Sequence, residues 1–189
     1  MFERYTEQAR RAIFFARYEA VFQPAREIST SHILICLTRD AGSRADVVGS
    51  LNMNTVQLRS ALGIPYPVNA PVLLASEQNI PLNDNSKKVL AYAAEEAYFD
   101  DEYWIDTDHL LRGLLRFPNE ASDVLQSISL DLAKVREASK LHRKKFPAKK
   151  TLYHRLFGRP YKAHRVTLAK WIVALMVCVL AALLIRLFN

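Results

Sequence analysis

The sequence repeats itself at a fixed offset of 77 residues. Residues 6–62 align with residues 83–139 without a gap, and identities run along the whole alignment. They include Ala16/Ala93, Glu19/Glu96, His32/His109, Leu37/Leu114, Arg39/Arg116 and Arg59/Arg136. Because chance does not produce this density of identities at one offset, the sequence predicts two copies of one unit that pack about a pseudo-twofold axis and share a core.

Each copy has the pattern of four helices. Small alanines recur at helical spacing after Thr6, a predicted N-cap, and later helices are expected from Thr30, over 43–51 and over 54–62. The second copy predicts helices over 84–99, 107–116, 119–128 and 131–145, with caps at Asn83, Thr107 and Asp131. The predicted fold is therefore all-α, an eight-helix duplicated repeat over residues 1–145.

Proline punctuates the stretch between the copies. Repeat 1 covers about 2–62 and repeat 2 about 83–145, and four prolines fall in the 63–82 linker. Proline lacks the backbone N–H that a regular helix needs and disfavours helical backbone in the residue before it. We expect the linker to be an extended connector.

The C-terminal end carries an apolar run. Residues 171–185 contain no charge, and residues 168–188 would span about 31 Å as a helix, enough to cross a hydrocarbon core. Lys170, Trp171 and Arg186 lie where membrane-interface anchors are favoured. A buried core helix is the alternative, but such a helix usually keeps a polar stripe. The sequence predicts one C-terminal transmembrane helix over 168–188, a tail anchor.

Charge is divided unevenly along the chain. Residues 1–137 hold 14 Lys+Arg and all 19 Asp+Glu, whereas residues 138–189 hold 12 Lys+Arg and no acid. The basic 146–167 segment reads as a juxtamembrane linker that contacts anionic lipids, and it places the N-terminal domain on the cytoplasmic side. We expect a single-pass protein of a bacterial plasma membrane, and nucleic acid is the less favoured partner of the basic segment.

Motifs for catalysis are missing from the 189 residues. No GxxxxGK[ST], HExxH, CxxC or GxSxG pattern occurs, so we expect no enzyme activity, no catalytic residue, no cofactor and no metal. His32 and His109 each follow a threonine by two positions, and we expect them to pack or hydrogen-bond at a helix start. The acidic run from Asp100 to Asp108 is interpreted as a solvated loop, with a docking surface for basic partners as the alternative.

Three segments carry a resemblance to a known family. Residues 2–9 (FERYTEQA) resemble the opening of the amino-terminal domain of Clp-family ATPases. Residues 30–37 (TSHILICL) and 107–114 (TDHLLRGL) resemble its twin Thr-Glu-His-Ile-Leu-Leu-Gly-Leu motifs. The resemblance covers about residues 2–145. It implies a globular eight-helix domain that docks adaptors and substrates, and it does not imply the family's ATPase.

The same resemblance implies a ligand site. In some family members the first-helix threonine and the motif's acid form a pocket for phosphorylated arginine in each repeat. The matching positions here are Thr6 with Ser31 and Asn83 with Asp108. Ser31 has lost the carboxylate that would pair with a guanidinium, and Asp108 keeps one. Helix capping is the alternative role for all four residues.

These features predict a membrane-tethered, non-enzymatic module that docks protein substrates or adaptors for a separate Clp unfoldase or protease. One alternative is a direct modulator that binds a Clp ATPase ring. Another, of a different class, is a lipid-surface or nucleic-acid-binding protein that acts through the basic linker.

Overall fold

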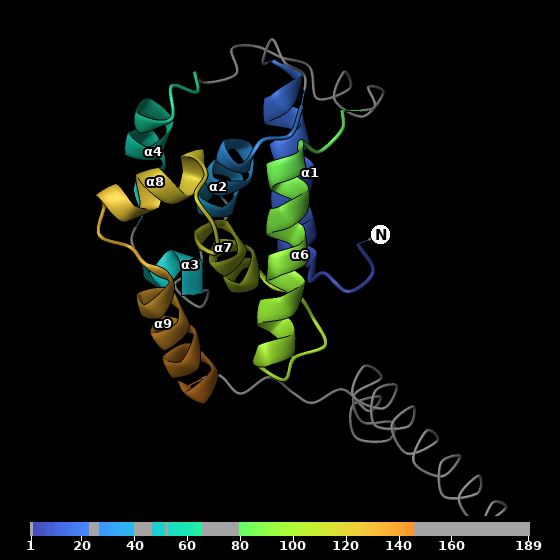
Figure 1. The fold of residues 1–189 in the computed structure, drawn as a ribbon, viewed down its shortest axis with the longest axis vertical. Helices are drawn as coiled ribbons and strands as arrows, with labels where there is room; N and C mark the ends of the chain where they lie inside the picture. The colour runs from blue at the N-terminus through green and yellow to red at the C-terminus, as the bar shows by residue number, and fades with distance from the viewer. Residues whose placement is uncertain (1, 23–26, 40–46, 52, 66–79, 146–189) are drawn as a thin grey trace, which may run out of the picture. The chain divides into compact units, whose positions relative to one another are not determined.

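The computed structural model describes residues 2–22, 27–39, 47–51, 53–65 and 80–145, which form an all-helical body (Figure 1). The first copy contains α1 (Glu7–Val21), α2 (Thr30–Arg39), α3 (Val47–Ser50) and α4 (Thr55–Ala61). The second copy contains α6 (Asp84–Phe99), α7 (Thr107–Leu115), α8 (Glu120–Ser127) and α9 (Leu132–Lys145). These bounds agree closely with the predicted ranges wherever the structure describes them, so the prediction of an all-α duplicated unit is confirmed.

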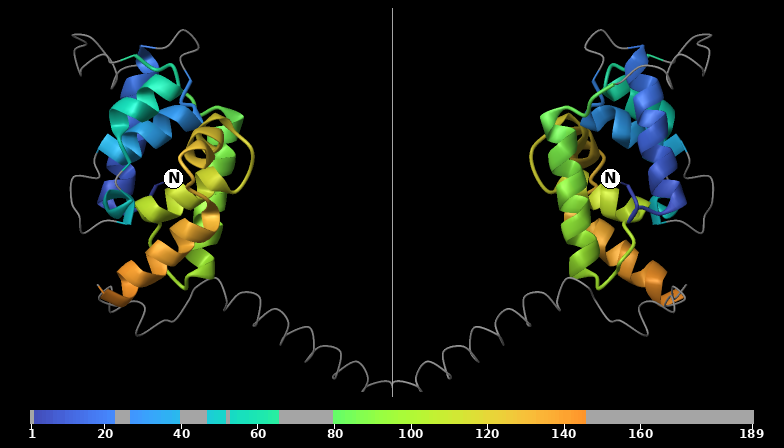
Figure 2. Two further views of the ribbon diagram at one scale, coloured as in Figure 1. Left: turned by 90° about the vertical axis from the view of Figure 1, so that its left-hand side faces the viewer. Right: turned by 90° about the vertical axis from the view of Figure 1, so that its right-hand side faces the viewer.

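Two short backbone pairings join the copies. Tyr5 pairs with Ile105, and Ile28 pairs with Leu82, each as an isolated parallel bridge. These are one pairing seen twice, because Leu82 and Ile105 lie 77 positions after Tyr5 and Ile28. The segment before the first helix of each copy therefore lies against the segment before the second helix of the other. Figure 2 shows the copies as two sides of one body, residues 2–65 in blue to cyan and residues 80–145 in green to orange.

Backbone hydrogen bonds follow the same symmetry. The amide of Thr6 donates to the carbonyl of Ile105 at 3.0 Å, and the amide of Asn83 donates to the carbonyl of Ile28 at 3.1 Å. The bonds satisfy amides at the starts of α1 and α6, where no earlier helical turn offers a carbonyl. The predicted pseudo-twofold relation is thus built into the backbone itself.

Helices α2 and α7 lie at the centre of the body, between α1 and α6 on one side and α3, α4, α8 and α9 on the other (Figure 1). Every residue from Thr30 to Thr38 in α2 is buried, and so is the whole of α7. The small residues of α1 face this centre and are fully buried, namely Ala9, Ala12, Ala16 and Ala20. Small side chains let neighbouring helices approach closely, as the alanine spacing predicts.

Helices α6 and α7 lie very close to each other at Gly113. A Cβ atom added there would lie 2.5 Å from the carbonyl oxygen of Val89 and 3.1 Å from the amide nitrogen of Ala93. Both atoms belong to the backbone of α6, so neither can rotate away. Glycine is therefore required by the packing of these two helices.

Some predicted features lie outside the described residues. They are most of the linker (66–79), the basic juxtamembrane segment (146–167) and the predicted span (168–188) with Lys170, Trp171 and Arg186. Among the helices within 2–145 that the structure describes, none is long and apolar enough to cross a membrane.

Candidate ligand-binding site at the start of α7

Helix α7 begins with a reciprocal cap. Asp106 is the N-cap, and its carboxylate accepts a hydrogen bond from the amide of Thr107 at 2.8 Å. The amide of Asp106 in turn donates to Nδ1 of His109 at 2.9 Å. The cap is thus one residue earlier than predicted, because Asp106 has the extended backbone of an N-cap whereas Thr107 is already helical.

The first copy has the same arrangement at the start of α2. The amide of Ser29 donates to Nδ1 of His32 at 3.0 Å. The prediction that both histidines hydrogen-bond around a helix start is confirmed. In each, Nδ1 accepts a hydrogen bond, as Glu or Gln does in the usual capping box.

The carboxylate of Asp108 lies inside the body and is held by two arginines. Asp108 is only 5% exposed to solvent. Nη2 of Arg112 donates to Oδ2 at 3.1 Å, and Nη2 of Arg143 donates to the same oxygen at 2.8 Å. Burial alone would raise the pKa of Asp108, but the neighbouring His109 and the charges of the two arginines outweigh it and hold that pKa below its usual value.

Two further acids from the loop after α6 join this cluster. Arg143 lies 2.7 Å from Oδ2 of Asp100 and 2.7 Å from Oε1 of Glu102, and Arg112 lies 2.5 Å from Oδ2 of Asp100. Burial would raise the pKa of Asp100, but its contacts with His109, Arg112 and Arg143 hold it well below its usual value. Burial raises the pKa of Glu102.

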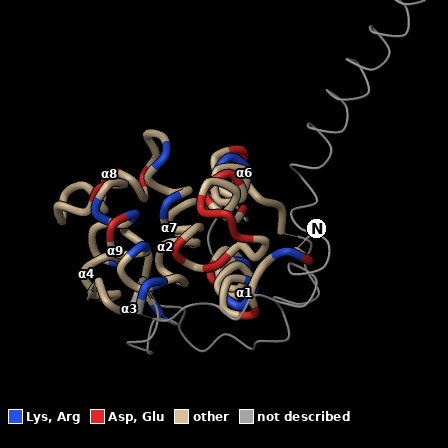
Figure 3. Tube along the Cα trace, turned by 90° about the horizontal axis from the view of Figure 1, so that it is seen from below, with Lys and Arg blue, Asp and Glu red and all other residues tan. Residues whose placement is uncertain are grey.

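The acidic run is therefore not a solvated loop, and the sequence prediction is wrong on this point. Asp101 is exposed, whereas Asp100 and Asp108 are drawn into ion pairs. Figure 3 shows acidic positions gathered beside α6. Arg112 lies only four residues after Asp108, but Arg143 lies 35 residues after it, so local sequence gives no sign of this second arginine.

The same cluster has the donor set of a metal site. Ligand atoms of Asp100, Asp108 and His109 lie within 4.8 Å of one another. However, Oδ2 of each aspartate already contacts the guanidinium groups of Arg112 and Arg143. A cation would have to displace a guanidinium, so the arrangement is suited to binding guanidinium rather than a metal ion.

Thr6 and Asn83 each cap a helix of their own copy and also contact the other copy. The hydroxyl of Thr6 donates to Oδ1 of Asp106 at 2.8 Å, which joins the start of α1 to the start of α7. Asn83 caps α6 by accepting from the amide of Ser86, and its own amide bonds to Ile28 just before α2. The structure thus brings Thr6 to the helix start that carries Asp108, and Asn83 to the segment before Ser31.

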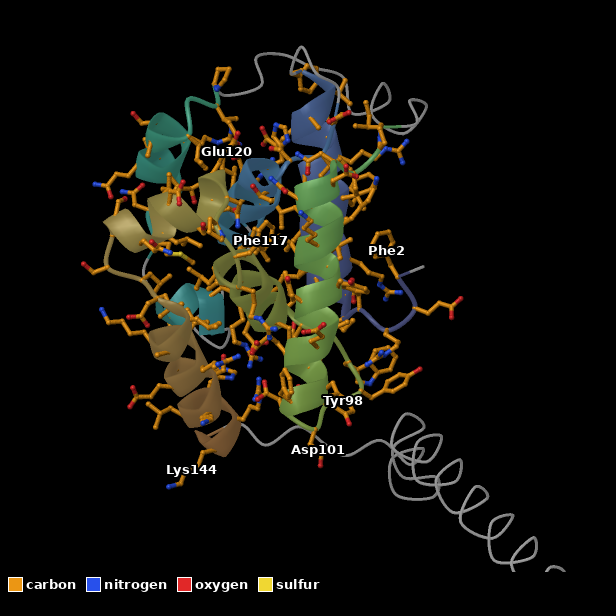
Figure 4. All side chains as sticks on the ribbon, in the orientation of Figure 1. Phe2, Tyr98, Asp101, Phe117, Glu120 and Lys144 are labelled. Carbon is orange, nitrogen blue, oxygen red and sulfur yellow. The ribbon has the colours of Figure 1, made fainter. Side chains whose placement is uncertain are left out.

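Ser31 has no carboxylate of its own, but the carboxylate of Glu120 lies beside it. Its hydroxyl donates to Oε2 of Glu120 at 2.8 Å, and Glu120 lies in the first turn of α8 in the other copy (Figure 4). Glu120 is exposed, in contrast to the buried Asp108. Sequence alignment of the copies could not find Glu120, because the position 77 residues earlier is Ser43.

Comparison with known proteins gives relatives over the same region. The chain is 34% identical over 142 residues to "ATP-dependent Clp protease ATP-binding subunit ClpA homolog" of Guillardia theta, covering 72% of this chain and 16% of that protein. It is 29% identical over 139 residues to "Chaperone protein ClpB" of Oceanobacillus iheyensis, covering 72% and 17%. The fold matches the N-terminal domain of the chaperone ClpD from Arabidopsis thaliana with a TM-score of 0.59 and 24% identity, over 76% of this chain and 97% of that domain. The body is a Clp N-terminal-domain-like region.

This Clp-like region corresponds to a small part of the curated relatives, because the chain spans only about 16% of the length of the first of them. A structure titled as a study of a malarial protein secretion system has the same fold, with a TM-score of 0.58 and 20% identity over 82% of this chain and 99% of that one. No protein-family model matches the chain.

The Clp-like region also contains a glutamate–arginine pair in each copy, and the glutamate of each pair is buried. Glu19 bonds to Arg59 with an Oε2–Nη1 distance of 3.1 Å, and Glu96 bonds to Arg136 with an Oε2–Nε distance of 3.0 Å. In the sequence these residues stand out only as repeat identities. The signal for pairing is that both an acid and an arginine 40 positions later are kept in each copy.

Proposed function

We propose that this chain is a membrane-tethered, non-enzymatic protein-binding module that docks substrates or adaptors for a Clp unfoldase. The Clp N-terminal-domain-like body carries the proposal, because that region in Clp proteins lies outside the ATPase machinery and the body here has the same fold. The proposed partners are therefore proteins, either clients or a Clp ATPase with its adaptors.

The membrane part of the proposal is supported by the sequence alone. The uncharged run 171–185, flanked by Lys170 and Arg186, has the composition of a single span, and the basic 146–167 segment favours a cytoplasmic body. In native membranes the full-length chain should stay in the pellet after high salt and after alkaline carbonate. Release of the intact chain by either wash would contradict the membrane span, and the basic segment would then be the part that contacts lipid.

The geometry at the start of α7 supports a guanidinium-binding role for the docking site. Asp108 already binds two guanidinium groups of its own chain. Thr6 is held near the same helix start by its hydrogen bond to Asp106. The N-terminus of α7 also favours a negatively charged group of a ligand. We propose that an arginine or phosphoarginine side chain of a client binds there. Asn83 and Ser31 would form the equivalent place at the start of α2.

Calorimetric titration of the 1–145 fragment with an arginine-phosphorylated peptide tests the ligand. Asp108→Asn keeps the shape and removes the charge, so affinity should fall by about 10- to 150-fold, the usual effect of losing a charged hydrogen-bond partner. Ser31→Ala should hardly change affinity, and Ser31→Glu should strengthen binding by adding a carboxylate beside Glu120. Equal losses for Asp108→Asn and Ser31→Ala would contradict the site.

A second candidate function is direct modulation of a Clp ATPase ring. It is favoured by one observation: the fold match covers 97% of a Clp N-terminal domain, so this body has the shape of a part that such rings carry themselves. Capture of a Clp ATPase without clients, together with a change in its ATPase rate, would favour modulation over client docking.

A further inference from the structure

Arg143 fills the place that the proposed function gives to a ligand. Its guanidinium lies 2.8 Å from Oδ2 of Asp108, 2.7 Å from Oδ2 of Asp100 and 2.7 Å from Oε1 of Glu102. A guanidinium offers five N–H donors in a planar fork, and the three carboxylates lie against Nη2 and Nε of that fork. The contacts are those that an arginine of a client would make.

The two arginines of the cluster differ in access. The side chain of Arg112 is 1% exposed, comes from α7 itself and also contacts Glu96 at 3.3 Å. The side chain of Arg143 is 24% exposed and comes from the last turn of α9. Lys144, its neighbour, and Asp101, just after α6, lie at the same end of the body (Figure 4). Arg112 is thus part of the core, whereas Arg143 is held at the surface by the end of a helix.

The duplicated fold does not require this cluster. The Glu–Arg pair is present in both copies, but the acids and the arginine around Asp108 belong to the second copy alone. The positions 77 residues before Asp100, Glu102, Asp108 and Arg143 are Gln23, Ala25, Ser31 and Tyr66. An ionic cluster that one copy has and the other lacks is not a requirement of the shared architecture.

Charge in the cluster makes Arg143 replaceable only by another cation. Three carboxylates face two guanidinium groups and His109. If the end of α9 leaves, three carboxylates face one guanidinium, and buried carboxylates without a partner are costly. A guanidinium from outside would relieve that cost, whereas an uncharged group would not.

We propose that Arg143 is an internal competitor that occupies the guanidinium site of the second repeat, so that a ligand binds there only when the end of α9 detaches. The inference rests on the proposed function and names the regulation of its site. In the sequence, the basic 146–167 segment follows α9.

The test uses the full-length chain in detergent micelles and three versions of one peptide, carrying arginine, phosphoarginine or lysine. Arg143→Ala should bind one or both guanidinium peptides about 10-fold or more tightly than the wild type, because the competitor is gone. The lysine peptide should gain little. Adding Asp108→Asn to Arg143→Ala should remove the gain, and Lys140→Ala, on the exposed face of α9, should leave affinity unchanged.

Hydrogen exchange supplies a second readout that does not depend on affinity. The amides of the last turns of α9 should exchange faster in Arg143→Ala than in Lys140→Ala, and peptide binding to the wild type should speed the same amides. Arg143→Lys keeps the positive charge but lacks the planar fork of donors. Its exchange rates in α9 should therefore lie between those of the wild type and those of Arg143→Ala.

The outcomes separate the two proposals. Equal affinity of the wild type and Arg143→Ala for the guanidinium peptides, with both binding measurably, would overturn the internal competitor and leave the site in place. Absence of binding in every variant, with helical melts intact, would overturn the site and the competitor together.

Discussion

The hydroxyl of Thr6 donates a 2.8 Å hydrogen bond to the carboxylate of Asp106, one hundred residues later and in the other copy of the repeat. Thr6 also caps its own helix by accepting from the amide of Ala9 at 3.2 Å. One side chain therefore caps α1 and ties it to the start of α7. The two copies exchange their entry segments, so neither is complete without the other.

Thr6→Ala should accordingly cost more than an ordinary cap. We expect the free energy of unfolding of the 1–145 fragment to fall by about 1–2 kcal/mol, the upper part of the range for N-caps. Asn54→Ala is the control, because Asn54 caps only its own helix α4, and it should cost about 1 kcal/mol or less. Urea unfolding measures both, and a smaller loss for Thr6→Ala than for Asn54→Ala would contradict the cross-copy role.

Glu96 should be among the most sensitive positions of the body. It is fully buried and contacts Arg112, Arg116 and Arg136, so Glu96→Gln removes the buried carboxylate charge that three arginines share. Breaking a buried pair of this kind typically costs about 3–5 kcal/mol. Glu95→Gln, whose side chain is half exposed, should cost about 0–1 kcal/mol. Thermal melts of both variants compare them directly, and equal losses would refute the burial argument.

Gly113→Ala should destabilise the body, although the same exchange in an open helix gains stability. Alanine is favoured over glycine inside a helix by about 1 kcal/mol. Here the new Cβ would lie 2.5 Å from a carbonyl oxygen of α6, and α6 and α7 would have to separate. We expect a net loss of about 1–3 kcal/mol in unfolding free energy, as in other overpacked cores. A gain in melting temperature would show that the two helices can separate freely.

Stability should fall as the pH drops below about 6.5, the ordinary histidine value, because of His32. Burial lowers the pKa of His32, and the nearby Glu19 and Glu120 only partly offset it. The unfolded chain therefore binds a proton at a higher pH than the folded chain, and stability is lost by up to about 1.4 kcal/mol per pH unit until the folded pKa is reached.

His32→Gln isolates this effect, because Gln can accept the same hydrogen bond from the amide of Ser29 and does not titrate. The slope of unfolding free energy between pH 7 and pH 5 should become shallower in His32→Gln than in the wild type, and an unchanged slope would contradict the role of His32. The lowered pKa values of Glu96, Asp100 and Asp108 change the unfolding free energy only below about pH 4, outside this range. The raised pKa of Glu102 changes stability with pH in the opposite sense, and this contribution is the same in the wild type and in His32→Gln.

Much of the fold could be predicted from sequence, because the duplicated unit depends on local signals. Alanine spacing gave α1, capping residues gave the helix starts, and the offset of 77 gave the twofold relation. Such signals involve residues within a turn of one another or identities at one fixed separation. The exchange of entry segments was not predicted, since two bridges of one residue pair each leave no periodic pattern.

The candidate site was predicted less well, because its partners are far apart in the chain. Asp108 was singled out from the sequence as the retained acid, but Arg143 comes from 35 positions later and Glu120 reaches Ser31 from 89 positions later. Side chains brought together by helix packing have no fixed spacing. Burial also changed the acidic run from the expected solvated loop into an ion-pair cluster.

Partner capture from native membranes tests the central claim most directly. The full-length chain and its 146–189 tail would each be cross-linked in the membrane and the captured proteins compared. We expect a Clp ATPase, its adaptors or its clients to be enriched with the full-length chain and lost with the tail alone, and we expect Glu96→Gln to weaken capture as the body unfolds. Capture of the same proteins by the tail alone would contradict a docking role for the Clp-like body.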